Sequence, residues 1–485
     1  MELRVHNSYT TIVGFVSPDV HQLLTQLMTY QNDIEGEKGQ LFYLLKKAKR
    51  FNNQGQYHKI MARIKHLEAT EFVCLYKDNV FPTGLLNIVL EGLAALNVNF
   101  QLTDLREIPN PSAIVRWNNK PFDPRYYQAD MISLGLKHGR GIFESAVGTG
   151  KSLIMAYLIM ELKVNSLVIV PSVGLSAQLY NDFCAWFGYQ HVQLLDASQI
   201  RKLKTPRLIS IVTVQSLASL QKSGEFAAFA NKMQAVHVDE IHHSGASSYT
   251  ALLPEMDHIY HRFGYTGTFL RNDNKTLEMW GFLSNVLYRY SAKQAIADGY
   301  LTPMECVVHK LTGKSNRKYP KEYEANYCGN PDMLQRIYEI CNSVTQGSQV
   351  LILVKQKDKS GAIIHEYLNT LGIQNCYISG DNDESEITQA ISAFNDKKFQ
   401  VLIGSSVIGE GIDVRSTDHL IMCQGGKSEI VMVQAIGRAI RLYPGKSVAY
   451  VHDFQFVDTN YMEKHFDERM EIYQRNFECP VRYAS

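Results

Sequence analysis

Ser145-Ala-Val-Gly-Thr-Gly-Lys-Ser152 is the stretch that decides how the rest of this chain folds. A short apolar run precedes it and Leu153 to Met160 follows it, so the pattern predicts a strand, a glycine-rich loop and a helix. Gly148 and Gly150 let backbone N–H groups turn inward, where they can surround phosphate oxygens. The start of the helix adds its positive end to the same site. We therefore expect this loop to bind phosphate.

Individual residues of the loop have separate predicted roles. Lys151 supplies a positive charge for β- and γ-phosphates, and Ser152 supplies a hydroxyl ligand for Mg²⁺. Thr149, between the two glycines, belongs to the nucleotide-contacting set. One position departs from the usual pattern, because Ser145 stands where a phosphate-binding loop has glycine. Taken alone, the motif also fits a chance glycine-and-serine turn before a helix.

The length and composition limit the possible classes of protein. With 485 residues the chain has room for about three domains of roughly 150 residues each. Hydrophobic content of 45% and charged content of 20% are typical of a globular protein. The eight cysteines form no C-x-x-C pair, which argues against a structural metal and against a secreted disulfide framework. Without a visible signal peptide or an apolar run near ~18 residues, we expect an intracellular protein and no membrane.

A strongly basic run lies near the N-terminus, although the net charge of the whole chain is only +1. From Lys38 to His66 there is no Asp or Glu, whereas there are eight Lys or Arg. Such a run suits a nucleic-acid partner, and a solvated helix face is an equally good interpretation. The residues of the run that we expect to contact nucleic acid are Lys46, Lys47, Lys49 and Arg50.

Residues 1–110 mix strand-like and helical segments and predict a small α+β domain with a basic face. Ser17-Pro-Asp is a helix start, Phe72 to Tyr76 a strand, and Leu85 to Leu96 an amphipathic helix. Pro109-Asn-Pro111 marks a boundary. The predicted domains are therefore 1–110, 111–302 with the phosphate loop, and 303–485 with a C-terminal helix.

Two blocks of alternating strands and helical patterns follow, which is typical of βαβ units with parallel sheets. In the first block we expect strands at 141–144, 166–170, 208–212, 235–238 and 261–265. In the second block we expect strands at 350–354, 376–378, 400–403, 419–422 and 448–451. Between 301 and 327 the pattern loosens, and we expect a connection there.

An acidic motif, Asp239-Glu240-Ile241-His242, follows the apolar strand at 235–238. At the carboxyl end of a strand, Asp239 can hold Mg²⁺ through water, and Glu240 can orient or deprotonate the water that attacks a γ-phosphate. An acidic turn after a buried strand is the alternative. Thr266-Gly-Thr268 follows another strand, and its hydroxyls can hydrogen-bond the acidic motif.

Two further motifs suit a nucleotide. One is Gln434-Ala-Ile-Gly-Arg438-Ala-Ile-Arg441, in which Gln434, Arg438 and Arg441 lie on one face of a helix. The two arginines could reach a γ-phosphate held by the first block. Alone, this motif favours a solvated basic helix. In Arg125-Tyr-Tyr-Gln128, the amide of Gln128 could read an adenine edge.

The ordered set of motifs resembles the DExH-type helicases of superfamily 2 across roughly residues 120–455. The resemblance implies two tandem RecA-like parallel-sheet domains of the α/β class, with ATP and Mg²⁺ between them. It also implies that ATP hydrolysis opens and closes the cleft and steps the protein along nucleic acid. The motifs that carry it are 125–128, 145–152, 170–178, 212–216, 239–242, 266–268, 405–413 and 434–441.

The resemblance also implies roles for residues that spacing alone does not assign. On the nucleotide site it adds His242, Gly411, Asp413 and Gln434. It also implies that two sets of residues contact the backbone of a nucleic acid. These are Ser172, Gln178, Thr213 and Gln215 of the first domain, and Lys355, Ser379, Gly380, Ser405 and Ser406 of the second.

Within the superfamily, the small basic domain ahead of a compact motor looks like that of the phage UvsW-like branch-migration helicases. This resemblance implies an ATP-dependent DNA helicase or translocase that remodels forks, Holliday junctions and R-loops in replication, recombination and repair. Its partners would be branched or double-stranded DNA, with an RNA–DNA hybrid as a further candidate, in the host cytoplasm. A DExH RNA helicase, the motor subunit of a restriction system, and a nucleic-acid-binding scaffold with an inactive ATPase remain open alternatives.

Overall fold

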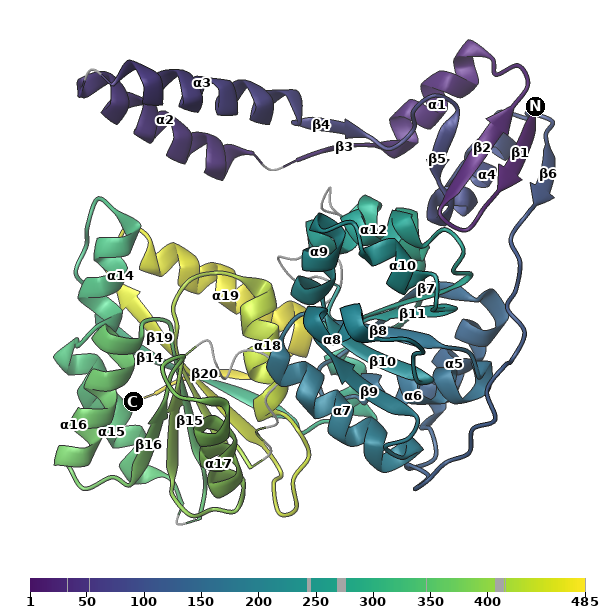
Figure 1. Ribbon diagram of the computed structural model, residues 1–485. Helices are drawn as coiled ribbons and strands as arrows, with labels where there is room; N and C mark the ends of the chain where they lie inside the picture. The colour runs from purple at the N-terminus through teal and green to yellow at the C-terminus, as the bar shows by residue number, and fades with distance from the viewer. Residues whose placement is uncertain are drawn as a thin grey trace.

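The chain forms two seven-stranded parallel sheets and, at its N-terminus, a smaller mixed sheet with a long helical hairpin (Figure 1). The computed structural model describes all residues except 33, 52, 242–245, 268–275, 346, 406–413, 415 and 485. The predicted α/β class, with two tandem RecA-like sheets after a small α+β unit, is confirmed. Among the described residues, no helix is long and apolar enough to span a bilayer.

The first parallel sheet has the strand order β13-β7-β12-β11-β8-β10-β9. The five predicted strands form its centre, and nearly all of their side chains are buried because helices cover both faces. They are β7 (Arg140–Ser145), β8 (Ser166–Val170), β10 (Ile209–Thr213), β11 (Ala235–Val238) and β12 (His261–Thr266). The two edge strands, β9 (Val192–Leu195) and β13 (Val286–Tyr290), were not predicted, since Gln193 interrupts the apolar residues of one and the other is only partly buried.

Nine helices accompany this sheet within the described part of the first unit. Three of them, α6, α7 and α9, begin directly after β7, β8 and β10, so their N-termini lie at the carboxyl edge of the sheet. The helices are α5 (Tyr126–His138), α6 (Lys151–Leu162), α7 (Val173–Phe187), α8 (Ala197–Lys202), α9 (Val214–Lys222), α10 (Phe226–Ala230), α11 (Ala246–Leu252), α12 (Thr276–Leu283) and α13 (Ala292–Ala297).

The second sheet has the order β16-β17-β15-β18-β19-β14-β20. The predicted strands correspond to β15 (Val350–Val354), β16 (Asn375–Ile378), β17 (Val401–Gly404), β18 (His419–Cys423) and β19 (Ala449–Val457). A short further strand is β20 (Val481–Tyr483). The helices are α14 (Tyr319–Tyr327), α15 (Pro331–Ser343), α16 (Ala362–Thr370), α17 (Glu384–Asn395), α18 (Glu429–Ala439) and α19 (Met462–Phe477).

The connection predicted for residues 301–327 was wrong, because this segment contains β14 (Met304–Thr312) and α14. The strand lies inside the sheet, between β19 and β20. Its polar residues broke the apolar pattern in the sequence, yet two of them have partners from distant parts of the chain. Glu305 pairs with Arg482, and His309 Nε2 lies 3.0 Å from His452 Nδ1.

The N-terminal unit consists of the sheet β5-β2-β1-β6 with two helices packed against it. As predicted, a helix begins after Ser17, whose hydroxyl accepts a hydrogen bond from the Val20 N–H. The elements are β1 (Glu2–Val5), β2 (Tyr9–Val13), α1 (Pro18–Met28), β5 (Val80–Pro82), α4 (Leu86–Ala95) and β6 (Gln101–Asp104). Residues 105–125 contain neither helix nor strand, and the domain limits predicted nearby remain predictions.

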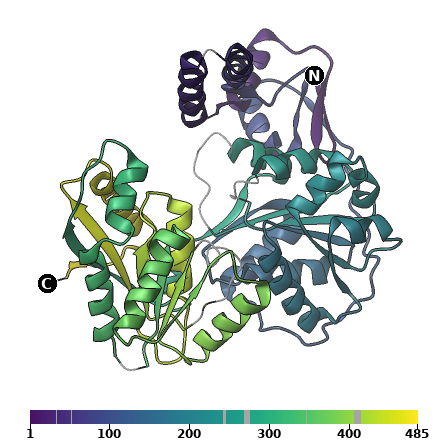
Figure 2. The ribbon, with the colours of Figure 1, turned by 60° about the vertical axis from the view of Figure 1, so that its left-hand side comes forward.

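The basic run forms a helical hairpin that we call the arm, residues 35–69. It consists of α2 (Glu35–Arg50) and α3 (Gln54–Ala69), carried by the antiparallel strands β3 (Thr29–Gln31) and β4 (Phe72–Cys74). Figure 1 shows the arm extending from the N-terminal unit toward the second α/β unit, and Figure 2 shows the same arm nearly end-on.

The N-terminal unit is docked firmly on the first α/β unit. Two buried arginines of that unit reach into it: Arg140 Nη1 donates to the Asn7 carbonyl at 2.7 Å, and Arg262 Nη2 to the Ser8 hydroxyl at 2.7 Å. A Cβ added at Gly84 would lie 1.8 Å from the Trp280 carbonyl oxygen, so only glycine permits this approach. The N-terminal unit and the first α/β unit therefore form one packed body.

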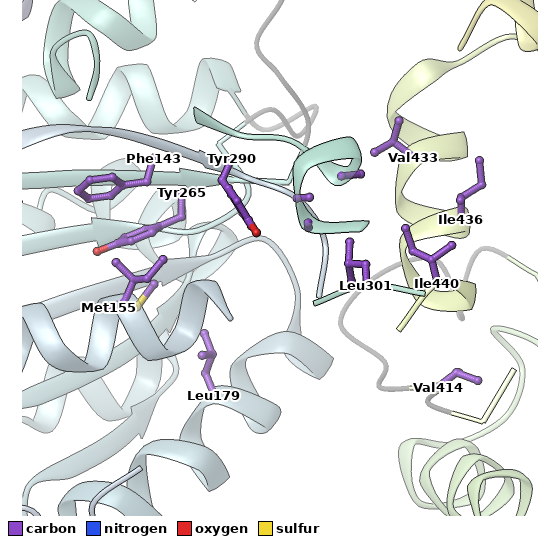
Figure 3. Close-up of a cluster of buried hydrophobic side chains, with 14 of the residues drawn as sticks. Phe143, Met155, Leu179, Tyr265, Tyr290, Leu301, Val414, Val433, Ile436 and Ile440 are labelled. Carbon is purple, nitrogen blue, oxygen red and sulfur yellow. The ribbon is translucent and has the colours of Figure 1, made fainter. Parts of the chain in front are cut away.

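An apolar cluster joins the two α/β units (Figure 3). Tyr290 and Leu301 come from the end of the first unit and its connection, whereas Val433, Ile436 and Ile440 come from α18 and its C-terminal end. The two units therefore meet beside the phosphate loop and the arginine helix.

Candidate nucleotide site and nucleic-acid interface

The phosphate loop joins β7 to α6, and its backbone follows the predicted pattern. Gly148 and Gly150 have φ angles of +86° and +85°, in the left-handed region that favours glycine. Ser145 is the last residue of β7 and pairs with Tyr290 of β13, so its backbone is extended. Its hydroxyl hydrogen-bonds that of Thr149. Because an extended residue does not need to be glycine, serine is tolerated here and adds a contact within the loop.

Two residues of α5 hold the loop from behind. The Tyr127 hydroxyl and Gln128 Nε2 both donate to the Thr149 carbonyl, at 2.7 and 2.9 Å. Gln128 Oε1 accepts the Arg125 N–H at 2.8 Å, and the Arg125 guanidinium lies 4.1 Å from the centre of the Tyr300 ring. Both ends of the Gln128 amide are thus engaged within the protein. Reading an adenine edge would require the release of one of them, and this role stays a prediction.

The acidic motif lies beside the lysine of the loop. Lys151 Nζ is 3.0 Å from Glu240 Oε1, and the Gly267 N–H donates to Glu240 Oε2 at 3.4 Å. Glu240 has φ +48°, a strained value for a non-glycine residue, and its N–H donates to Asp239 Oδ1 at 3.0 Å. The 266–268 turn is therefore linked to the acidic motif through a backbone N–H, and the contacts expected from its hydroxyls remain a prediction.

Asp239 and Ser152 have the properties of Mg²⁺ ligands. Burial and the neighbouring Glu240 raise the pKa of Asp239 to about 7, although Lys151 opposes the shift. A cation beside Asp239 would favour its charged form. The Ser152 hydroxyl makes no hydrogen bond to any described residue, and both groups offer the oxygen ligands that Mg²⁺ prefers. Nowhere in the described chain do three His, Cys, Asp or Glu gather around a possible metal position.

The arginine helix reaches the loop from the second unit. A Cβ added at Gly148 would lie 3.3 Å from Arg441 Cγ, so this arginine lies directly over the loop. Gly437 makes the approach possible, because a Cβ there would be 2.5 Å from Val147 Cβ. The sequence motif predicted that Arg441 would reach the loop. It did not predict the close contact of Gly437 with Val147 that allows this approach.

Arg438 has a different environment from Arg441. It is buried, and its Nη1 donates to the Gln434 carbonyl one turn earlier at 2.8 Å. The connection between the units fixes the end of this helix, since the Thr302 N–H and hydroxyl donate to the carbonyls of Ile440 and Arg441 at 2.7 and 3.1 Å. Thr302 was not singled out in the sequence, because its partners lie far along the chain.

The residues of the first unit that were assigned to nucleic acid lie at the ends of the neighbouring strands β8 and β10. Ser172 and Thr213 are the N-caps of α7 and α9. Gln215 Nε2 donates to the Pro171 carbonyl at 2.9 Å and joins the two loops, while Gln178 is half-buried on α7. The fold brings these residues to one edge, and their roles remain predictions.

Residues of the second unit line the corresponding edge of its sheet. Lys355, Ser379 with Gly380, and Ser405 follow the adjacent strands β15, β16 and β17. Lys355 is exposed, and its Nζ lies 5.3 Å from the centre of the Tyr323 ring. Ser379 and Ser405 are buried, and their assignment to nucleic acid remains a prediction.

Four of the predicted site residues lie outside the described residues: His242, Ser406, Gly411 and Asp413. The second threonine of the 266–268 turn lies outside them as well.

Each of the two α/β units matches a known protein family. Residues 121–271 match the family described as "Type III restriction enzyme, res subunit", and residues 331–443 match "Helicase conserved C-terminal domain". The chain is 24% identical to the "ATP-dependent DNA helicase uvsW" of Enterobacteria phage T4, over 73% of this chain and 76% of that protein.

A second relative and a solved structure extend the comparison. "Putative helicase 22" of Sulfolobus islandicus filamentous virus is 23% identical, over 91% of this chain and 83% of that protein. A fragment of a putative HsdR subunit of a type I restriction enzyme from Vibrio vulnificus YJ016 has the same fold. The TM-score is 0.57 at 17% identity, covering 75% of this chain and 69% of that one.

Proposed function

We propose that this chain, an ATP-hydrolysing helicase of superfamily 2, is a DNA helicase or translocase that remodels branched DNA. Its substrates are forks, Holliday junctions and R-loops, in replication, recombination and repair. The observation that carries this proposal is the arm, a basic helical hairpin that extends from the N-terminal unit beside the motor (Figure 1). A motor alone can move along a strand, whereas a second basic element can hold another part of the same DNA.

The charge of the arm is available to an external anion. Arg63 pairs with Glu37 and Lys38 with Glu68. Six further cations have no carboxylate partner among the described residues: Lys46, Lys47, Lys49, Arg50, Lys59 and Lys65. All six side chains are exposed. A cluster of unpaired cations of this kind binds the phosphate backbone, with an affinity that falls steeply with salt.

The base of the arm is also hydrogen-bonded to the first α/β unit. The Tyr30 hydroxyl on β3, at the base of the arm, hydrogen-bonds Glu278 of α12. A displacement of the motor on DNA would therefore be transmitted to whatever the arm holds. This connection supports action on two DNA segments at once, which branch migration requires.

In the proposed cycle, ATP bridges the two units. The loop amides and Lys151 would hold the β- and γ-phosphates, and Ser152 with Asp239 would hold Mg²⁺, which would shield phosphate charge. Glu240 orients the attacking water, and Arg441 reaches the γ-phosphate from the second unit. Hydrolysis of ATP breaks this link between the two units. The second unit, which carries Arg441, can then shift relative to the first.

Removing the arm tests this proposal. The Asn32 N–H donates to the Glu71 carbonyl at 2.8 Å, so a two-residue Asn-Gly turn can replace residues 33–70 without disturbing β3 or β4. We expect a loss of fork and four-way-junction affinity and of ATPase stimulation by them, with basal ATPase retained. Unchanged junction affinity would contradict the proposal.

The class of nucleic acid requires a separate comparison. ATPase stimulation should be measured with a fork, a four-way junction, plain duplex, single strand and RNA, at two salt concentrations. The proposal expects the branched DNAs to stimulate most. Stronger stimulation by RNA would instead identify an RNA helicase.

A further inference from the structure

The helix α2 has two chemically different faces. One face packs against α3 through an apolar cluster that belongs to the arm alone. The buried members of this cluster are Leu41, Ala48, Ile60 and Ile64. This packing fixes the direction of the opposite face of α2, which points away from α3 into solvent.

The exposed surface of α2 carries aromatic and basic side chains close together. Phe42 and Tyr43 are 42% and 66% exposed. Each lies one turn before a lysine, Lys46 and Lys47, so the aromatic and basic positions are neighbours on the helix surface. The arm therefore offers flat apolar faces within a field of positive charge.

The end of α2 repeats this combination. Phe51 follows Arg50 at the tip of the arm and is 70% exposed. A single exposed aromatic needs no explanation, but three within ten residues of an acid-free basic stretch are a distinct arrangement. If the arm bound only phosphates, its lysine and arginine side chains would be sufficient. Aromatic faces are the groups on which unpaired bases stack.

We propose that the exposed aromatic residues of the arm, Phe42 and Tyr43 on α2 and Phe51 at its tip, bind unpaired bases by stacking. The ligand is single-stranded DNA at a branch point, and the lysines beside the aromatics hold its phosphates. This inference rests on the proposed function and deepens it, because it identifies the strand feature that the arm recognises. Base pairs inside a duplex are already stacked and cannot use these faces.

The position of the arm agrees with this role. In Figure 1, α2 lies on the side of the arm nearer to the second α/β unit. Unpaired bases held there would lie above the motor, while the motor moves along the strand to which they belong.

The test uses the full chain and its binding to DNA without nucleotide. The variants are the double substitution Phe42→Ala/Tyr43→Ala and the single substitution Phe51→Ala, with Tyr43→Phe as the conservative change. Alanine is favourable in a helix, so the double variant keeps the fold of α2. Phe15→Ala is the matched control, since Phe15 is 83% exposed but lies outside the arm.

Two readouts separate stacking from phosphate binding. In fluorescence anisotropy, a fork with single-stranded arms should bind about tenfold more weakly to the double variant, whereas duplex of equal length should change by less than about twofold. The fluorescence of a 2-aminopurine placed in the unpaired strand beside the branch should be quenched when the parent chain binds. This quenching should be lost with the double variant. Tyr43→Phe and Phe15→Ala should resemble the parent chain.

Equal weakening of fork and duplex binding, or an unchanged fork affinity in both alanine variants, would overturn the stacking proposal. These outcomes are independent of the remodelling activity. If the aromatics contribute to fork binding but branched DNA does not stimulate the ATPase, the proposed function fails and the stacking proposal stands.

Discussion

Lys151 and Glu240 form an ion pair across the phosphate loop, with Nζ 3.0 Å from Oε1, and each side chain is less than one-fifth exposed. The pair joins the group assigned to the phosphates to the group assigned to the attacking water. A bound γ-phosphate would compete with Glu240 for the lysine. Nucleotide binding would then release the Glu240 carboxylate from Lys151 at the place where hydrolysis needs it.

Replacing Lys151 with alanine should abolish ATP turnover, because the loop loses its only side-chain cation. Steady-state phosphate release should fall at least about 10³-fold, since a charge contact to the reacting phosphate contributes several kcal/mol. Lys151→Arg is the charge-preserving control. Near-normal hydrolysis by Lys151→Ala would refute the assignment of the loop.

Glu240→Gln should bind ATP at least as tightly as the parent chain but should not cleave it. The amide keeps the size of the side chain and removes the charge that competes with phosphate for Lys151. Nucleotide affinity, from titration with a fluorescent ATP analogue, should be measured beside single-turnover hydrolysis. A variant that still hydrolyses ATP at the parental rate would assign the base elsewhere.

Arg441→Ala should slow hydrolysis and leave nucleotide affinity close to that of the parent. Arg441 comes from the second unit and lies over Gly148, so its contribution depends on the two units meeting. We expect a reduction in kcat of about 10²-fold or more with KM changed little. A rise in KM alone would make Arg441 a nucleotide-binding residue instead.

Gly437→Val should reproduce much of the Arg441→Ala defect without touching the arginine. A Cβ at Gly437 would lie 2.5 Å from Val147 Cβ, so α18 must move away from the loop. ATPase activity should fall at least about tenfold with each unit still folded, as judged by thermal unfolding. Gly39→Ala is the matched control, because a Cβ there meets nothing within 4 Å; if Gly437→Val behaves like it, the contact does not control closure.

Acid should destabilise the protein through buried neutral histidines. His452 lies between His309 and His419, 3.0 Å from each, and burial lowers the pKa of the two outer residues to about 4. His237 and His261 of the first sheet shift in the same direction. Below pH 6.5 the unfolded chain binds protons that the folded chain does not, so stability falls from about pH 6.5 toward pH 4.

Urea unfolding at pH 7.5, 6 and 5 measures this effect. Each such histidine should contribute on the order of 1 to 3 kcal/mol across the window. His419→Gln, which removes one titrating group and keeps a hydrogen-bonding side chain, should flatten the dependence. Equal stability at all three pH values would show that the histidines do not control acid unfolding.

Local patterns predicted the elements whose residues are mostly apolar. The strands at 166–170, 235–238 and 350–354 were predicted with their observed limits, because a strand buried on both faces reads as a nearly continuous apolar run. β14 was missed because its charged and histidine residues find partners across the sheet. Such partners are more than a hundred residues away in the sequence, so no local pattern reveals them.

By itself, the sequence determined the chemical parts of this protein: a phosphate loop, an acidic strand end, an arginine-bearing helix and a basic N-terminal run. These parts depend on short spacings and on the residue types that phosphate chemistry requires. Only the tertiary structure decided which parts meet. It placed Arg441 over Gly148 through the glycine at 437, engaged Gln128 behind the loop, and turned the basic run into an arm with exposed aromatic residues. Contacts between distant segments depend on how whole sheets and helices pack, and that information is spread over the entire chain.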